Sequence, residues 1–443
     1  MQNDTSRHIP TAPVRAVLRP IAGSILLLAL VVVLCRGSLR QLIWFGDEYQ
    51  LLSELQNSNL LSWPLTVFAE NFVPVFKFLW GAAVELSFGN YRIMLALNWL
   101  THGLNIVILG VLLWRSGFRE FSIWIALLLF GVPSTIVETL GWSVQWSAVL
   151  AVLFFLSALV LLNCRLERGG RSTPSLLILL LLLACCSAFS FSRGVLLCAV
   201  LAAYALISSL LKGQSVKSAI LPCCAVLLPG LVSTIVIVNY SSGNHHGLSH
   251  MTPHQYEQLI NFFLYFLCLN PFYNLFAGTE INLWMGALVC SFKFLLIAFA
   301  LGTKRNNAQI LTLLISLLLF DLGNALLVSV GRFHTGAAFA LSSRYQYESL
   351  LCISPFAAIF FEELFSRIEG RRPIWRLKMG FILILAICLV HSWPRVLQEW
   401  GAWRGVAGRS YLQGSMKEPR WIGVPPWISP DTYNSLRARF NLH

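Results

Sequence analysis

Two adjacent carboxylates, Asp47 and Glu48, follow directly after the first long apolar segment of the chain. A carboxylate at a membrane surface is partly desolvated, which raises its pKa and makes it a useful general base that still reaches a water-soluble substrate. Acidic residues also flank helices as solvated caps, and this second interpretation stays open for an isolated Asp-Glu pair. The pair is therefore the first candidate for catalysis.

Three arginines are candidates for binding a phosphate group. Arg193 lies in the short segment SFSRG between two apolar runs, and Arg332 and Arg344 lie in the segment GRFHTGAAFALSSRY at 331–345. A guanidinium grips phosphate oxygens with paired hydrogen bonds. The alternatives are that Arg193 reaches ordinary lipid headgroups and that Arg344 makes a structural ion pair, for instance with Glu348.

Other polar and aromatic residues are expected either near the extracytoplasmic face of the membrane or within the bilayer. Polar residues inside a membrane are costly unless they are paired or line a cavity, so they mark either helix contacts or a substrate site. For His102 the alternative is hydrogen bonding between helices. The residues expected to line a substrate cavity are Glu70, Lys77, His102, Glu138, Trp142, Gln145, His334 and Tyr345.

The segment NHHGLSHMTPHQYEQ at 244–258 contains four histidines. His250 and His254 share a face if the stretch is helical, and this spacing can hold a divalent metal. Pro253 falls between them, however, and no complete ligand set is evident. We therefore expect a polar loop that touches substrate, with His250 and His254 as weak metal candidates and a divalent metal as a possible cofactor.

The composition defines the elements that must position these residues. The 443-residue chain is 57% hydrophobic and only 12% charged, with mean hydropathy +0.70, whereas soluble domains carry about a quarter of their residues charged. A soluble globule is excluded. The net charge of +13 would raise nucleic-acid binding in a soluble protein, but in a membrane protein basic residues mark cytoplasmic loops, so no nucleic-acid partner is expected.

Apolar periodicity predicts eleven spanning helices, each near the roughly 20 residues that a bilayer requires. They cover residues 14–35, 91–114, 120–140, 143–163, 175–191, 195–211, 218–238, 281–301, 309–330, 346–365 and 379–393. Asn270 and Pro271 interrupt the apolar segment 259–276, which is therefore predicted to be an interfacial or re-entrant helix.

The distribution of basic residues predicts the orientation. With the N-terminus inside, more than half of the 32 basic residues fall in short cytoplasmic loops, as the positive-inside rule expects. Four segments then face the extracytoplasmic side, and function is sought there. They are the first outer loop 36–90, which we expect to contain surface helices, the His-rich loop 239–258, the loop 331–345 and the aromatic and basic tail 394–443.

The order of these features resembles the GT-C superfamily of membrane glycosyltransferases, which includes protein O-mannosyltransferases, aminoarabinose transferases and O-antigen-modifying enzymes. The resemblance rests on an outer-loop Asp-Glu, a second span reading LNWLTHGLNIVIL, an outer turn reading PSTIVETLGWSVQW and a late SSRY. It implies an all-α polytopic bundle with a GT-C-like transmembrane module at 1–240, a variable transmembrane module at 241–393 and an extracytoplasmic tail at 394–443.

The resemblance also implies a function. A sugar donor carried on polyprenyl phosphate would be used at the outer face of a bacterial inner membrane, with a cell-envelope glycan or lipid-linked molecule, as in lipopolysaccharide O-antigen modification, as acceptor. The catalytic acidic residue falls on Asp47, with Glu48 beside it. Since polyprenyl phosphate leaves as an anion that Arg193, Arg332 or Arg344 can stabilise, one base is sufficient for an inverting hexosyl or pentosyl transfer.

Two other functions remain open. A flippase or carrier for a lipid-linked saccharide would also need intramembrane polar residues and phosphate-binding arginines, but it predicts paired repeat halves, which the sequence does not show. An O-antigen-ligase-like polysaccharide transferase would depend most on Arg332, His334 or Arg344 and need not use Asp47.

Overall fold

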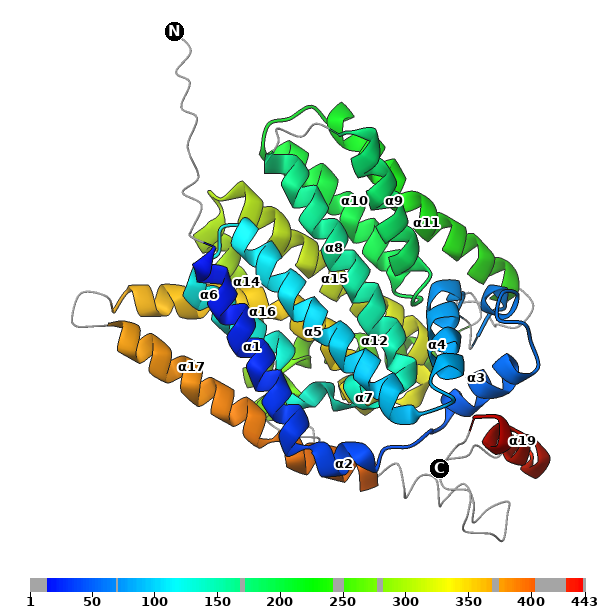
Figure 1. Ribbon diagram of the computed structural model, residues 1–443. Helices are drawn as coiled ribbons and strands as arrows, with labels where there is room; N and C mark the ends of the chain where they lie inside the picture. The colour runs from blue at the N-terminus through cyan, green and yellow to red at the C-terminus, as the bar shows by residue number, and fades with distance from the viewer. Residues whose placement is uncertain are drawn as a thin grey trace.

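The fold is all-helical over the residues that the computed structural model describes, which are 14–68, 71–167, 172–241, 251–276, 282–368, 374–402 and 428–440. Within these ranges ten helices are long and apolar enough to cross a membrane. Figure 1 shows the long helices side by side in one bundle. The protein is therefore a polytopic helical membrane protein.

The long apolar helices follow the predicted spans closely. They are α1 (Arg15–Leu34), α5 (Tyr91–Arg115), α6 (Glu120–Gly131) continued by α7 (Val137–Gly141), α8 (Trp146–Glu167), α10 (Gly194–Leu211), α11 (Lys217–Ser241), α14 (Leu283–Lys304), α15 (Ala308–Arg332), α16 (Gln346–Ser366) and α17 (Ile374–His391). The agreement arises because a run of apolar residues must satisfy its backbone groups internally, and a helix does so.

The predicted span 175–191 is shorter in the structure. It forms α9 (Pro174–Ala188), which has 15 residues and a length of about 22 Å. Pro174 occupies the first turn of this helix, where a missing N–H costs nothing. The helix ends at Ala188, so Phe189 and Phe191 lie in the turn that leads to α10. α9 packs against α8, α10 and α11.

The first outer loop contains helices, in keeping with its apolar periodicity. They are α2 (Arg36–Arg40), α3 (Asp47–Gln56), the short 3-10 helix η1 (Trp63–Leu65) and α4 (Pro74–Leu86). Trp44, Trp63 and Trp80 are buried here, and their rings form edge and tilted contacts around Trp80. This aromatic cluster gives the loop its own packed interior on the end of the bundle.

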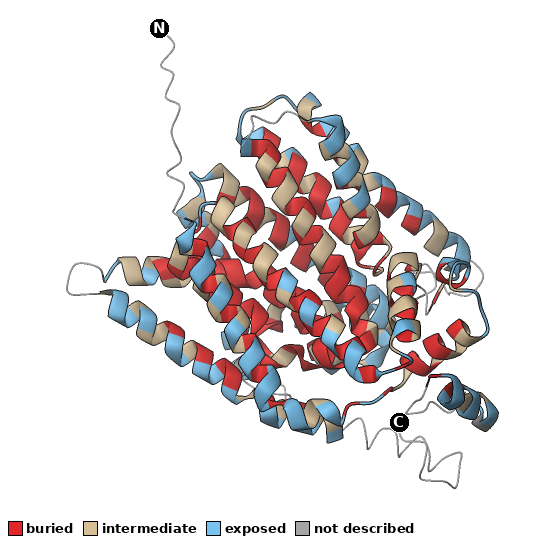
Figure 2. Cartoon of the chain, in the orientation of Figure 1, coloured by how far each residue is buried: buried red, intermediate tan, exposed pale blue. Residues whose placement is uncertain are grey.

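The predicted modules 1–240 and 241–393 share one core. α16 packs against α6, and α15 packs against α10 and α16. A single cluster of buried apolar residues extends from α1 to α19 (Pro430–Phe440), and Figure 2 shows the buried residues concentrated where α5, α8, α15 and α16 meet.

The tail 394–443 is described only to residue 402 and again from 428 to 440. The helical span that begins at Ile374 continues to Ala402. The later helix α19 packs on α3, where the Tyr433 and Tyr49 rings lie 6.0 Å apart and Arg439 bonds to Glu85 at 2.5 Å. Figure 1 shows α3, α4 and α19 at the same end of the bundle.

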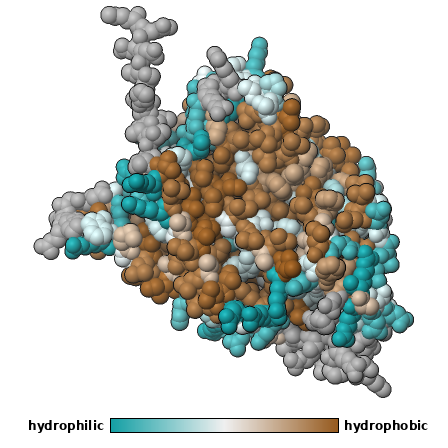
Figure 3. All heavy atoms as spheres, viewed as in Figure 1, coloured by the Kyte–Doolittle hydropathy of each residue, from teal (hydrophilic) through white to brown (hydrophobic). Residues whose placement is uncertain are grey.

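The surface carries a broad apolar belt. Figure 3 shows hydrophobic atoms over the long helices, with hydrophilic atoms bordering the lower rim around α2. Large exposed apolar side chains on the outer helices include Leu26, Leu100, Leu182, Leu231 and Leu288. This is the surface expected of helices that face lipid.

Candidate functional site at the α3 end of the bundle

A cavity of about 370 Å³ lies at the α3 end of the bundle. Its walls come from the start of α3, the η3 turn (Ser143–Gln145), the turn between α9 and α10, the last turns of α11 and α15, and the η7 turn (Ser343–Tyr345). Three segments that sequence analysis selected separately, around residues 47, 193 and 344, therefore meet at one site.

Asp47 is the first residue of α3 and lines this cavity. Gly46, which precedes it, has φ +58° and ψ −124°, a conformation that side-chain-bearing residues rarely adopt. Within the described chain the Asp47 carboxylate makes no hydrogen bond or ion pair. Burial raises its pKa, while the charges of Arg344 and Arg332 oppose that rise. Asp47 is thus a free, partly desolvated carboxylate beside two cations.

Glu48 points away from the cavity and is fully buried. One carboxylate oxygen accepts hydrogen bonds from the backbone N–H of Ser143 at 2.9 Å, from its hydroxyl at 2.6 Å and from the Tyr91 hydroxyl at 3.1 Å. The other accepts from the backbone N–H of Phe45 at 2.7 Å. Glu48 therefore does not line the cavity, where a catalytic role was predicted for it, and instead positions the start of α3 through hydrogen bonds to α5 and η3.

Arg344 and Arg332 approach the cavity from two elements. Arg344 pairs with Glu138, with Nε 3.1 Å from a carboxylate oxygen, and its guanidinium lies 5.8 Å from the centre of the Trp142 ring. Arg332, at the end of α15, is exposed and makes no ion pair with a described residue. Arg332 is therefore the cation most ready to bind an incoming anion.

Arg193 lines the cavity but is already neutralised. It is 6% exposed and lies 2.6 Å from a carboxylate oxygen of Glu348, between the rings of Phe191 and Tyr345. Gly194 follows it, and a Cβ there would lie 2.0 Å from the carbonyl oxygen of Ser187. The close approach of α9 and α10 thus fixes Arg193. The anticipated pairing of Arg344 with Glu348 is not the one found.

The remaining predicted cavity residues divide into two groups. Trp142, Gln145 and Tyr345 line the cavity, and Glu138 supports it through Arg344. Of the other four, Lys77, His102 and His334 are not among the residues that line it, and Glu70 is not among those that the structure describes.

Lys77 is buried in α4 and bonds to Glu54 at 3.1 Å; burial lowers its pKa and Glu54 opposes this. His102 is buried between the Tyr347 hydroxyl and the Gly131 carbonyl, each 3.0 Å away, so it joins helices as its alternative interpretation proposed. His334 is exposed and does not line the cavity. Glu70 lies outside the described residues.

The metal candidates do not assemble a ligand set in the described ranges, where no group of three His, Cys, Asp or Glu side chains is placed to hold a metal ion. His254 lies in the first turn of α12 (Pro253–Leu269) and its Nδ1 is 3.7 Å from Glu257. His250 lies outside the described residues.

The interrupted segment 259–276 forms α12 and α13 (Phe272–Phe276). The last turns of α11 and α15 both line the cavity. α14 precedes α15 and is joined to it by a short turn, so α14 begins at the end of the bundle where α15 finishes. The chain between α11 and α14, which includes α12 and α13, therefore leaves from the cavity end and returns to it. The Lys293 ammonium, about 15 Å along α14, bonds to the carbonyls of Leu267 and Asn270. The end of α12 therefore reaches well into the bundle before the chain returns.

Sequence reasoning missed three polar wall residues, Asn71, Ser192 and Thr234. Thr234 lies in an apolar span, and its hydroxyl bonds back to the Gly230 carbonyl, which is how an isolated threonine in a membrane helix usually satisfies itself. Nothing in the local sequence distinguishes it from other such residues. Asn71 follows Glu70 in the first outer loop, where only the charged neighbour was selected.

The charges at the site determine its chemistry. Asp47, Glu138 and Glu348 balance Arg193, Arg332 and Arg344, and two arginine–carboxylate pairs are formed. Asp47 and Arg332 have no bonded counter-ion among the described residues. A site of this kind can accept a proton at Asp47 and bind an anion at Arg332 and at the remaining donors of Arg344.

Comparison of the chain with protein-family models, with curated proteins and with solved structures found no match. What can be said of its class therefore rests on its own residues: it is a polytopic helical membrane protein with a charged cavity at one end.

Proposed function

We propose that the protein is a GT-C-type glycosyltransferase that moves a sugar from a polyprenyl-phosphate donor to an acceptor hydroxyl. We place the cavity at the extracytoplasmic face, as the distribution of basic residues suggests, and the resemblance to GT-C enzymes suggests a bacterial inner membrane. The observation that carries the proposal is the Asp47 carboxylate, which bonds to no described residue and lies in a cavity that also holds Arg332 and Arg344.

The proposed reaction uses these groups directly. Asp47 takes the proton of the acceptor hydroxyl while its oxygen forms a bond to the anomeric carbon. The bond from that carbon to the phosphate oxygen breaks, and its electron pair leaves with polyprenyl phosphate. Arg332 and Arg344 stabilise the charge of the leaving phosphate. Attack opposite the leaving group inverts the anomeric configuration.

Donor binding also favours the proton transfer. The positive charges of Arg344 and Arg332 hold the pKa of Asp47 below the value that burial alone would give. A bound phosphate neutralises part of that charge, so the pKa of Asp47 rises and the carboxylate becomes a stronger base. The base therefore gains strength when the donor is in place.

The surroundings of the cavity suit a lipid-linked donor. Val238 on α11 and Leu327 on α15 line it and are exposed to the outside of the bundle. The apolar chain of a polyprenyl group can lie against these residues while its phosphate reaches the arginines. This arrangement supports a donor that enters from the bilayer.

The class is tested by incubating the purified protein in lipid nanodiscs with radiolabelled polyprenyl-phosphate sugars and a mixed extract of envelope glycans. Label appearing in the glycan or lipid-linked fraction, and absent when the protein is omitted, supports the proposal. Movement of intact donor between leaflets of a vesicle without transfer would instead establish the carrier function. Transfer that needs a preassembled polysaccharide donor would establish the ligase function.

A further inference from the structure

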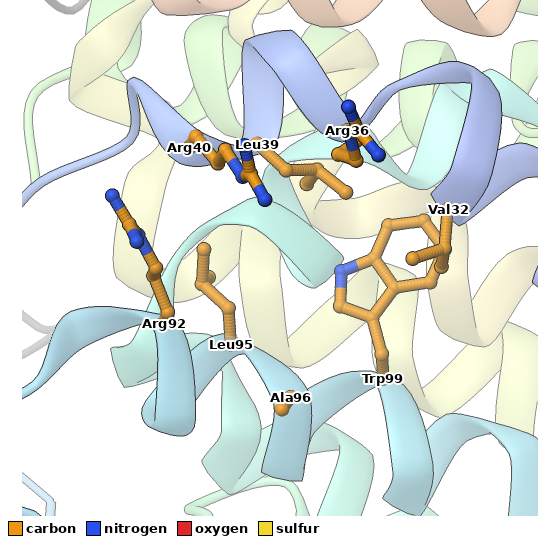
Figure 4. Close-up of a pocket in the computed structure, with 8 residues that line it drawn as sticks. All are labelled: Val32, Arg36, Leu39, Arg40, Arg92, Leu95, Ala96 and Trp99. Carbon is orange, nitrogen blue, oxygen red and sulfur yellow. The ribbon is translucent and has the colours of Figure 1, made fainter.

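A second cavity of about 200 Å³ lies between the end of α1, the short helix α2 and the first turns of α5. Figure 4 shows Arg36, Arg40 and Arg92 around its mouth, with Val32, Leu95 and Trp99 among the residues that line it. It belongs to the same end of the bundle as the first cavity, because α2 leads into α3.

The three arginines have no counter-ion in the described part of the chain. All three are exposed, and Arg40 and Arg92 also border an adjoining cavity of about 320 Å³. Three like charges at one site repel one another, so the arrangement is stabilised when an anion binds among them. Basic residues are less common at the extracytoplasmic ends of membrane helices than at the cytoplasmic ends. In the proposed orientation, these three arginines lie at the extracytoplasmic end, so their presence there calls for a specific reason.

The floor of this cavity presents one unused hydrogen-bond donor. Trp99 is 8% exposed, and its indole nitrogen has no hydrogen-bond partner among the described residues. The ring packs against the Trp393 ring, with ring centres 5.3 Å apart. Figure 4 shows the Trp99 nitrogen on the side of the ring that faces the arginines. A buried N–H without a partner costs free energy until an acceptor reaches it.

Apolar surface continues from the cavity along the bundle. Leu30 and Val33 on α1, and Leu100 and Leu104 on α5, are exposed on the two helices that border it. A ligand that places an anionic group among the arginines therefore has room for acyl chains against these helices. A free anion would leave that apolar surface uncovered.

We propose that this cavity, which we call the α2 site, binds the phosphate headgroup of an anionic glycerophospholipid of the surrounding membrane. The phosphate lies among Arg36, Arg40 and Arg92 and accepts the Trp99 N–H, and the acyl chains follow α1 and α5. The α2 site is distinct from the Asp47 cavity, and the proposal does not depend on the reaction performed there.

A lipid at the α2 site would also stabilise the position of the first outer loop, which contains Asp47 and Glu48. Arg40 precedes Asp47 by seven positions in the chain, and Arg92 directly follows Tyr91, whose hydroxyl bonds to Glu48. A headgroup that joins Arg40 to Arg92 therefore links α2, which precedes α3 in the chain, to the start of α5, to which Glu48 bonds. The bound lipid acts here as a structural ligand.

The test is a titration of the delipidated full-length protein with phosphatidylglycerol, followed by native mass spectrometry. The Arg36→Gln/Arg40→Gln/Arg92→Gln variant is compared with wild type and with a matched control, Arg15→Gln/Arg376→Gln/Arg437→Gln, whose arginines are exposed elsewhere. Each basic residue near a membrane surface contributes about fivefold to lipid affinity, so the first variant should bind its tightest phosphatidylglycerol about a hundredfold more weakly. The control should match wild type.

Two further arms identify the ligand. Trp99→Phe keeps the ring but removes the donor, and should weaken binding about tenfold. Phosphatidylcholine and millimolar inorganic phosphate should not displace the tightest phosphatidylglycerol from wild type. The proposal is overturned if the triple arginine variant binds phosphatidylglycerol as wild type does, if phosphatidylcholine binds equally well, or if inorganic phosphate displaces the lipid.

Discussion

Glu48 and Asp47 are neighbours of the same chemical type, and the structure predicts opposite consequences for replacing them. The Glu48→Ala substitution removes the acceptor of four hydrogen bonds. The Tyr91 hydroxyl retains the Gly141 carbonyl at 3.2 Å. The Ser143 hydroxyl still accepts from the Trp80 indole N–H, but its own O–H loses the Glu48 acceptor. The backbone N–H groups of Phe45 and Ser143 lose this acceptor as well.

The cost follows from the loss of these three bonds. A hydrogen bond to a charged acceptor contributes about 1.5–3 kcal/mol, and the removal of a fully buried carboxylate offsets part of the loss, so Glu48→Ala should destabilise the protein by about 4 kcal/mol. Asp47→Ala removes a carboxylate that burial disfavours and that bonds to no described group. Its effect on stability should be below about 1 kcal/mol.

The assay is unfolding of both variants in mixed micelles by titration with a denaturing detergent, monitored by tryptophan fluorescence. The expected result is a strongly lowered midpoint for Glu48→Ala and a midpoint close to wild type for Asp47→Ala. If Glu48→Ala unfolds within about 1 kcal/mol of wild type, the hydrogen-bonded position of Glu48 does not stabilise the loop, and the distinction drawn between the two carboxylates is refuted.

Two further predictions concern the arginines. Because the charge of Arg332 lowers the pKa of Asp47, Arg332→Gln should raise that pKa and move the acidic limb of the pH profile of kcat/KM to higher pH; a limb that moves to lower pH would contradict the assignment. Arg193→Met leaves Glu348 buried without its counter-ion and should cost about 3–5 kcal/mol in an unfolding titration. The double variant Arg193→Met/Glu348→Leu should recover most of that loss, and failure to recover it would show that the pair does not act as a unit.

The helices could be predicted from sequence because hydropathy is a local signal. Each predicted span has a helix at its place. Only the span 175–191 was predicted too long, because its last residues, 189–191, form an apolar turn that has the same hydropathy as an apolar helix. The meeting of Asp47, Arg193, Arg332 and Arg344 followed from placing them on one side of the membrane, although their shared cavity is set by packing between distant elements.

The partners of the charged residues could not be predicted. Glu48 accepts from Ser143, 95 positions away, so nothing local separated its role from that of Asp47. Arg344 and Glu348 have the spacing of a helical ion pair, but Ser343–Tyr345 is a 3-10 turn that precedes α16. Arg344 therefore faces Glu138, and Glu348 faces Arg193.

The central claim is that the Asp47 carboxylate is the base of a glycosyl transfer. The measurement that tests it most directly is the single-turnover rate of sugar transfer at saturating donor for wild type, Asp47→Asn and the matched exposed control Asp431→Asn, with donor affinity measured on the same samples. A positioned base contributes about 10²–10⁴-fold, so Asp47→Asn should slow transfer by that factor while donor affinity and the control rate stay unchanged. If Asp47→Asn transfers sugar as fast as wild type, Asp47 is not the base and the proposed mechanism is wrong.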